Sequence, residues 1–121
     1  NIIGYYTLSS DGISRDNVPI KFRKKIPHNY SVPVILLGRL AVDKIHKNKG
    51  YVAFMLVDAL KRSFQISEKS IGAMAIIVDP INDVALSFYE KYGFLKLVDS
   101  GKMFLPMKVI KDIIWLKTNL N

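Results

Sequence analysis

Two features of this sequence carry residue types suited to chemistry: a basic loop, and a tyrosine in a later helix. The loop, KIHKNKG, ends at Gly50 and directly precedes a segment with helical spacing of its apolar residues. Backbone N–H groups at a helix N-terminus, lysine side chains and a glycine that permits close approach together suit a diphosphate. A basic loop ahead of a helix can also be simply solvated. Taken alone, the loop is therefore a weak indication of phosphate binding.

The tyrosine belongs to the segment NDVALSFYEKYGF, which predicts a helix capped by Asn82 and stopped by Gly93. Tyr89 and Tyr92 lie on one side of this helix. A phenol has an ordinary pKa of about 10, so it is protonated at neutral pH and can donate a proton to a nearby anion. By position alone, Tyr89 would also fit a tyrosine that merely packs in the core. Tyr89 is the preferred proton donor and Tyr92 the alternative.

The hydrophobic pattern predicts a mixed α/β fold around one central sheet. The nearly continuous apolar run 32–42 is typical of a central strand covered on both faces. Residues 9–16 read as a polar connection, and Asn17 and Pro19 suit the start of a short helix. The expected strands are 2–8, 32–42, 72–78, 94–98 and 103–109, and the expected helices are 18–25, one that begins after residue 50, 82–92 and a short one within 110–121.

Size and charge narrow the functional classes. The 121 residues suit one domain, and 18 Lys and Arg against 10 Asp and Glu give a net charge of +8, which favours a polyanionic partner. No cysteine is present, which excludes disulfides, thiolate metal sites and cysteine nucleophiles and is compatible with a reducing cytoplasm. No apolar run approaches the ~20 residues of a membrane span. His28 and His46 are possible bases but fit surface positions better, and no metal-ligand cluster is evident.

Several segments resemble one enzyme family. IIGYYTLSSDGI, VPVILLGRLAVDK, NDVALSFYEKYGF and FLPMKVI resemble the acyl-CoA-dependent N-acetyltransferases of the GNAT superfamily, and within it the GNAT toxins of bacterial toxin–antitoxin pairs. The resemblance runs from about Ile3 to about Ile110 and lacks the family's opening segment. It implies the GNAT α/β fold, N-terminally incomplete, with the acetyltransferase domain over 1–110 and a C-terminal tail over 111–121.

The resemblance also implies acetyl-CoA as the acetyl donor, with no metal. The superfamily's pyrophosphate motif is Gln/Arg-x-x-Gly-x-Gly/Ala, and Lys47, Gly50 and Val52 stand at its three positions, where only the glycine fits fully. The preceding strand would offer its backbone to the pantetheine arm, and Tyr89 would protonate the departing CoA thiolate. The candidate cofactor-binding residues are Leu40, Ala41, Val42, Lys47, Asn48, Lys49, Gly50, Tyr51, Val52 and Asn82.

For the acceptor, the resemblance implies the amino group of aminoacyl-tRNA, whose acetylation would block translation. An α-amino group titrates at about 7.7–8.0, so a neutral fraction exists without a strong base. The family further implies a ribbon-helix-helix antitoxin as partner and a cytoplasmic location, with a homodimer as one open oligomeric state. Two alternatives stay open: acetylation of a small-molecule or protein amine, and an impaired remnant that only binds an antitoxin. The candidate RNA contacts are Lys21, Arg23, Lys24, Lys25, Arg39 and Lys44.

Overall fold

The computed structural model describes residues 4–42, 50–68, 72–98 and 100–119. They form five strands, four α-helices and one 3-10 helix, η1. In chain order these elements are β1 (Gly4–Ser14), η1 (Arg15–Asn17), α1 (Ile20–Arg23), β2 (Ser31–Val42), α2 (Tyr51–Ile66), β3 (Ala75–Val78), α3 (Asp83–Lys91), β4 (Leu95–Lys96), β5 (Met103–Pro106) and α4 (Met107–Asn119). The expected mixed α/β fold is confirmed.

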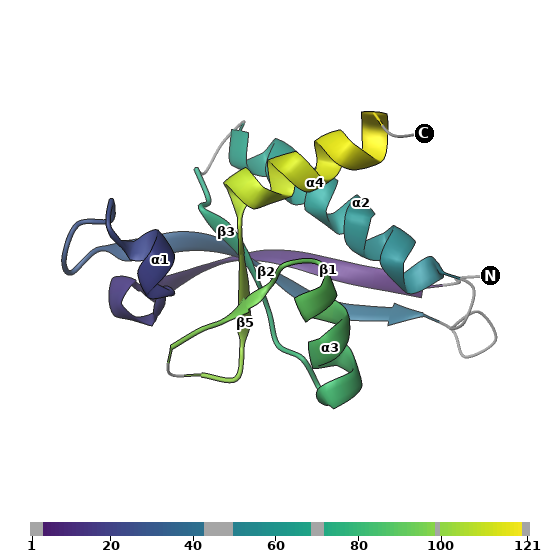
Figure 1. Cartoon of the computed structure of the whole chain (residues 1–121), viewed down its shortest axis with the longest axis horizontal. Coiled ribbons are helices and arrows are strands. Elements are labelled where there is room, and N and C mark those ends of the chain that lie inside the picture. Colours follow the sequence, from purple (N-terminus) through teal and green to yellow (C-terminus); the bar gives the residue numbers. More distant parts are fainter. Residues whose placement is uncertain (1–3, 43–49, 69–71, 99, 120–121) are drawn as a thin grey trace.

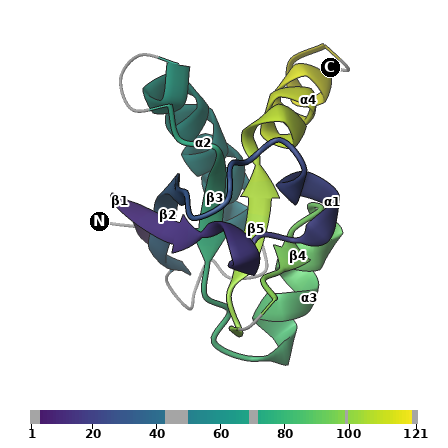
Figure 2. The same ribbon diagram turned by 90° about the vertical axis from the view of Figure 1, so that its left-hand side faces the viewer.

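The strands form one sheet in the order β1-β2-β3-β5-β4. The central pair, β2 and β3, is parallel, whereas β1 with β2, β3 with β5 and β5 with β4 are antiparallel. Helices α2 and α4 lie side by side over one face of the sheet, and α1 sits beside the opposite face near β5 (Figures 1 and 2). Helix α3 follows β3 and borders the end of the sheet to which β3 points (Figure 1).

Two buried clusters result from the alternation of side chains along the central strands. Ile35 of β2 and Ile76 of β3 belong to the first cluster, which α2, α3 and α4 cover. Val34 and Ile77 belong to the second cluster, on the face of the segment around α1. Since both faces of β2 and β3 are apolar and covered, these strands read as nearly continuous hydrophobic runs in the sequence.

The pairing of β1 with β2 contains a bulge. Tyr5 lies opposite Ala41 and Thr7 opposite Gly38, so Tyr6 alone faces the two β2 residues between those positions. Ile35 and Leu37 belong to the first cluster, but at the bulge the even-numbered Leu40 packs against it instead. The extra residue therefore inverts the alternation in the last part of β2.

Some expected boundaries are wrong. Strand β1 continues to Ser14, which pairs with Ser31, so most of the polar connection 9–16 is strand. Helix α1 covers only Ile20–Arg23, and Pro19, not Asn17, is its N-cap. The residue before a proline is biased toward extended backbone, and Val18 is indeed extended at φ −69° and ψ 137°. The expected helix over 18–25 is shortened for this reason.

Near the C-terminus, β5 ends at Pro106 and α4 begins at the next residue, so the strand expected over 103–109 is too long. Helix α4 runs across position 110, and Ile113 and Ile114 pack against the first cluster. Gly72, with φ 60°, stands outside β3, which begins only at residue 75. In the described part of the chain, no helix has the length and apolar character that a membrane crossing requires.

Candidate active site

A strand end without a partner on one side is the first element of the site. Strand β3 pairs with β2 only over Val34–Leu37, whereas β2 continues to Val42. On the side of β2 that faces β3, the backbone groups from Gly38 onward thus have no β-ladder partner among the described residues. Backbone N–H and C=O groups need hydrogen bonds. This edge, which includes the backbone of Leu40, Ala41 and Val42, can therefore bind an extended ligand.

The N-terminus of α2 is the second element. Gly50 is the N-cap of this helix and has φ 78°, a left-handed conformation that favours glycine. Because glycine has no side chain, no side-chain hydrogen bond caps the helix. The first hydrogen bond of the helix runs from Phe54 N–H to the Gly50 carbonyl, at 3.0 Å. No acidic residue lies in the first turn, and a Cβ at Gly50 would meet no described residue within 4 Å. As far as the described residues show, the positive end of this helix is therefore open to an anion.

The residues expected to bind the pyrophosphate, which form the proposed cradle, are only partly described. Tyr51 and Val52 form the first turn of α2, and both are half-buried. Lys44, Lys47, Asn48 and Lys49 lie outside the described residues, as does the side chain of Arg39. The described part of the cradle thus consists of the backbone from Gly50 onward.

Helix α3 supplies the third element, Tyr89. Its N-cap is Asn82, whose side-chain oxygen accepts a 2.8 Å hydrogen bond from Ala85 N–H, as expected. The Tyr89 side chain is 9% exposed, and its ring packs edge-on against Phe88 and Phe94 at centroid distances of 5.4 and 5.2 Å. Tyr92 lies at the C-cap of the same helix and is half-buried.

Burial raises the pKa of the Tyr89 phenol, because ionisation would place a charge in an apolar environment. Across residues 4–42, 50–68, 72–98 and 100–119, the buried side-chain oxygen or nitrogen that lacks a hydrogen-bond partner is Ser63 Oγ. The Tyr89 oxygen is not among such buried atoms. A protonated hydroxyl on a firmly packed ring can act as a proton donor to an atom within its reach.

Comparisons with known proteins identify the family. No protein-family model matches the sequence. A tRNA-acetylating toxin of Mycobacterium tuberculosis is 35% identical over 114 residues, which cover 93% of this chain and 67% of that toxin. The chain belongs to the GNAT toxins of toxin–antitoxin systems.

Solved structures of AtaT agree with this assignment. AtaT complexed with acetyl-methionyl-tRNAfMet is 32% identical, with a TM-score of 0.83 over 92% of this chain and 66% of AtaT. A tyrosine-to-phenylalanine mutant of AtaT, bound to acetyl-CoA and to the C-terminus of the antitoxin AtaR, is 25% identical, with a TM-score of 0.74 over 93% of this chain and 65% of AtaT. The chain thus spans about two thirds of the length of the GNAT toxins it matches.

In this GNAT toxin, sequence reasoning missed a polar contact at the bulge. The Tyr6 hydroxyl donates a 2.5 Å hydrogen bond to Asp58 Oδ2, and Arg62 Nε lies 3.5 Å from the same oxygen. Desolvation, and then the hydrogen bond and charge of Asp58, raise the pKa of Tyr6 to about 12. The contact connects β1, at the residue opposite the bulge, to α2. Tyr6 and Asp58 are 52 positions apart in the sequence, so no local pattern predicts their contact.

The expected RNA contacts of the toxin divide into two kinds. The Arg23 guanidinium donates through Nη2 to the carbonyls of Asp16 and Val18, both at 2.8 Å. Arg23 therefore holds the turn between η1 and α1 together. Lys21, Lys24 and Lys25 are exposed. The exposed lysines are the members of this set that remain available for a phosphate.

Proposed function

We propose that this chain is an acetyl-CoA-dependent N-acetyltransferase that modifies the amino group of aminoacyl-tRNA and so blocks translation. One observation carries the proposal: β2 runs past the end of β3 toward an α2 N-terminus that is open to an anion, while Tyr89 lies on the helix that follows β3. The kinship with a tRNA-acetylating toxin supports the choice of acceptor.

In this proposal the donor is bound mainly by backbone. The β2 edge at Leu40, Ala41 and Val42 takes the amide groups of the pantetheine arm. The N–H groups of Gly50, Tyr51 and Val52 take the pyrophosphate, with help from the helix dipole. Lys47, Asn48 and Lys49 extend this cradle by virtue of their place in the motif. The role of Asn82 is to fix the start of α3, because its oxygen already accepts a bond from the helix.

The reaction is a direct transfer. The neutral amine attacks the thioester carbonyl, the C–S bond breaks, and the amine nitrogen gives its surplus proton to solvent. Tyr89 donates its phenolic proton to the departing sulfur and regains one from solvent. Orientation of the two reactants supplies much of the acceleration. No strong base is required, since an α-amino group has a pKa of about 7.7–8.0 and is partly neutral at pH 7.

The partners follow from the same assignment. Aminoacyl-tRNA is the substrate, and its phosphates meet the exposed lysines around α1. A ribbon-helix-helix antitoxin is the protein partner, as expected for the toxin of such a pair; in the AtaT complex the C-terminus of the antitoxin AtaR is bound to the toxin. We propose a cytoplasmic location on the same ground, since charged tRNA and the antitoxin would be met there.

Transfer of labelled acetyl groups tests the proposal. The chain is incubated with labelled acetyl-CoA and, in separate reactions, with charged tRNA, the same tRNA uncharged, spermidine and a lysine-rich protein. Label should appear on charged tRNA alone and leave it when mild alkali hydrolyses the aminoacyl ester. Label on spermidine or protein only would replace the proposal with a different acceptor. Absence of both transfer and calorimetric acetyl-CoA binding would indicate a chain that only binds its antitoxin.

A further inference from the structure

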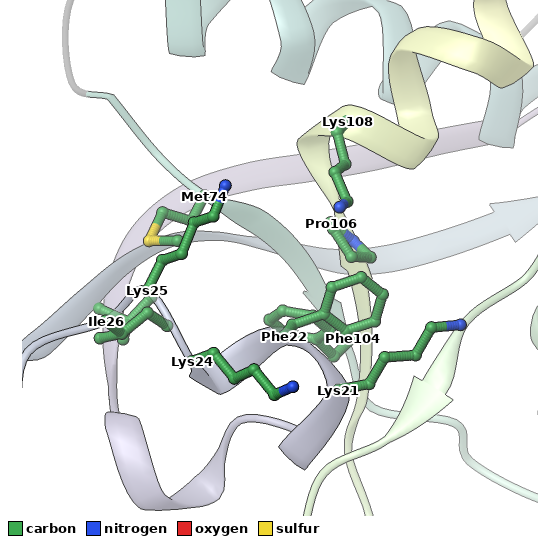
Figure 3. Close-up of a pocket in the computed structure, with 10 residues that line it drawn as sticks. Lys21, Phe22, Lys24, Lys25, Ile26, Met74, Phe104, Pro106 and Lys108 are labelled. Carbon is green, nitrogen blue, oxygen red and sulfur yellow. The ribbon is translucent and has the colours of Figure 1, made fainter.

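A pocket of about 390 Å³ lies on the sheet face opposite α2. It is bounded by α1, by β5 and by the first turn of α4, and Phe22 and Phe104 form its floor (Figure 3). The two rings are 5.9 Å apart and tilted by 43°. Met74 and Pro106 complete an apolar wall. The volume is within the range of about 300–1,000 Å³ that is typical of small-molecule sites.

Four lysines surround this apolar floor. Lys21, Lys24 and Lys25 come from α1 and the residues after it, and Lys108 reaches in from the first turn of α4 (Figure 3). The Nζ atoms of Lys21 and Lys108 each lie 5.5 Å from the centre of the Phe22 ring. None of the described residues that line the pocket is acidic. An apolar, aromatic cavity with a purely cationic rim suits a ligand that combines a flat apolar group with negative charge.

An unpaired nucleotide has this combination. Proteins that recognise single-stranded nucleic acid stack bases on aromatic side chains and hold the phosphates with cations. We propose that the pocket binds an unpaired nucleotide of the tRNA, with its base against Phe22 and its flanking phosphates on Lys25 and Lys108. The inference rests on the proposed function, which supplies the RNA, and adds a base-binding subsite to it.

The position of the pocket decides which nucleotide it can hold. Met74 immediately precedes β3, whereas the candidate cleft opens where β3 ends, at Val78. Four residues of strand span about 13 Å. The pocket also lies on the face of the second cluster, while Tyr89 belongs to the first. The occupant is therefore not the reacting nucleotide at the 3′ end but another nucleotide of the same RNA, which gives the substrate a second anchor.

Binding of uncharged tRNA without acetyl-CoA tests the subsite independently of catalysis. Phe22→Leu keeps an apolar side chain but removes the stacking surface, and should weaken tRNA binding by about 5-fold or more. The same variant should bind a blunt RNA duplex as the wild type does, because a duplex offers no unpaired base. Thermal unfolding shows whether Phe22→Leu is folded.

The rim is tested by the double variant Lys25→Gln, Lys108→Gln. It should lower the dependence of log affinity on log salt by about 1.4, since each phosphate contact on a single strand contributes about 0.7. Lys111→Gln is the matched control: it lies one turn further along α4, is exposed and does not line the pocket. Its slope should stay near that of the wild type. The rim variants are exposed and keep the proposal testable if Phe22→Leu does not fold.

The outcomes separate this inference from the proposed function. Charged tRNA that is acetylated normally, with tRNA affinity unchanged in both pocket variants, overturns the subsite and leaves the function intact. Selective loss of tRNA binding in a chain that never acetylates tRNA supports the subsite and removes the function. If the pocket variants lose affinity for an acidic antitoxin peptide but not for tRNA, the occupant is a protein and the nucleotide assignment is wrong.

Discussion

Replacement of Tyr89 by phenylalanine separates the proposed chemistry from the fold. The change removes one oxygen atom and leaves the ring contacts with Phe88 and Phe94. Since the hydroxyl has no hydrogen-bond partner among the described residues, its loss should alter the free energy of unfolding by less than about 0.5 kcal/mol. The acetyl-CoA contacts proposed here are made by backbone on β2 and α2, so the dissociation constant of acetyl-CoA should also stay unchanged.

The rate of transfer should respond strongly. A positioned general acid contributes typically about 10²–10⁴-fold, which corresponds to about 3–5 kcal/mol of barrier. We therefore expect Tyr89→Phe to reduce kcat by at least about 100-fold. Burial raises the pKa of Tyr89 above the ordinary value of a phenol. The wild-type chain should therefore lose its proton donor only at a higher pH than it would with an unburied phenol.

Release of CoA from acetyl-CoA gives kcat, and calorimetry gives the acetyl-CoA affinity of the same samples. Tyr92→Phe is the matched control, because it removes a hydroxyl from the same helix at its C-cap. A kcat of Tyr89→Phe within about threefold of the wild type would refute the assignment, as would a larger loss in Tyr92→Phe. A loss of acetyl-CoA affinity equal to the loss in kcat would show that Tyr89 binds the donor instead.

Three further changes test other parts of the structure. Tyr6→Phe removes the hydrogen bond to Asp58 and should lower the free energy of unfolding. The loss should be only about 1 kcal/mol, because the accepting carboxylate is half-exposed. In urea titrations this difference should be complete below pH 10 and vanish as the pH rises through about 12, where wild-type Tyr6 ionises. Gly50→Ala puts an L-residue at φ 78°, and Gly72→Ala puts one at φ 60°, both in open space among the described residues. Each should lower the free energy of unfolding by about 1 kcal/mol. Only Gly50→Ala should weaken acetyl-CoA binding in calorimetry. Ser63→Ala removes a buried hydroxyl without a partner and should raise the thermal unfolding midpoint, with a gain of about 1 kcal/mol.

Local signals in the sequence predicted the parts of the structure that depend on neighbouring residues. Asn82 caps α3, and Gly93, with φ 95°, follows its end, because capping depends on residues three or four positions apart. The order of strands and helices followed in the same way from the spacing of apolar residues. The expected helix over 18–25 was wrong because its pattern ignored the constraint that Pro19 places on Val18.

The contacts between distant segments could not be predicted in this way. The expected strand over 103–109 places Lys108 far from Lys25, yet both line one pocket. Helix α4 begins immediately after β5, and its Lys108 lies over the Phe22 ring of α1. Tyr6 and Asp58 meet across 52 positions for a comparable reason. Such pairs depend on strand order and helix placement, which a periodic pattern does not encode.

The bulge connects these distant contacts to the proposed site. An extra residue in β2 reverses the alternation of the strand, and Leu40 packs against the first cluster. Tyr6, the single residue opposite the bulge, is hydrogen-bonded to Asp58 of α2. This contact therefore connects the strand opposite the bulge to the helix whose N-terminus would bind the pyrophosphate. A backbone edge can take a ligand amide only if no neighbouring strand takes it first. Strand β3 ends at Val78, opposite Leu37, and so leaves the β2 backbone beyond Leu37 without a β-ladder partner among the described residues. The short length of β3, rather than any one side chain, is thus what leaves room for a ligand beside β2.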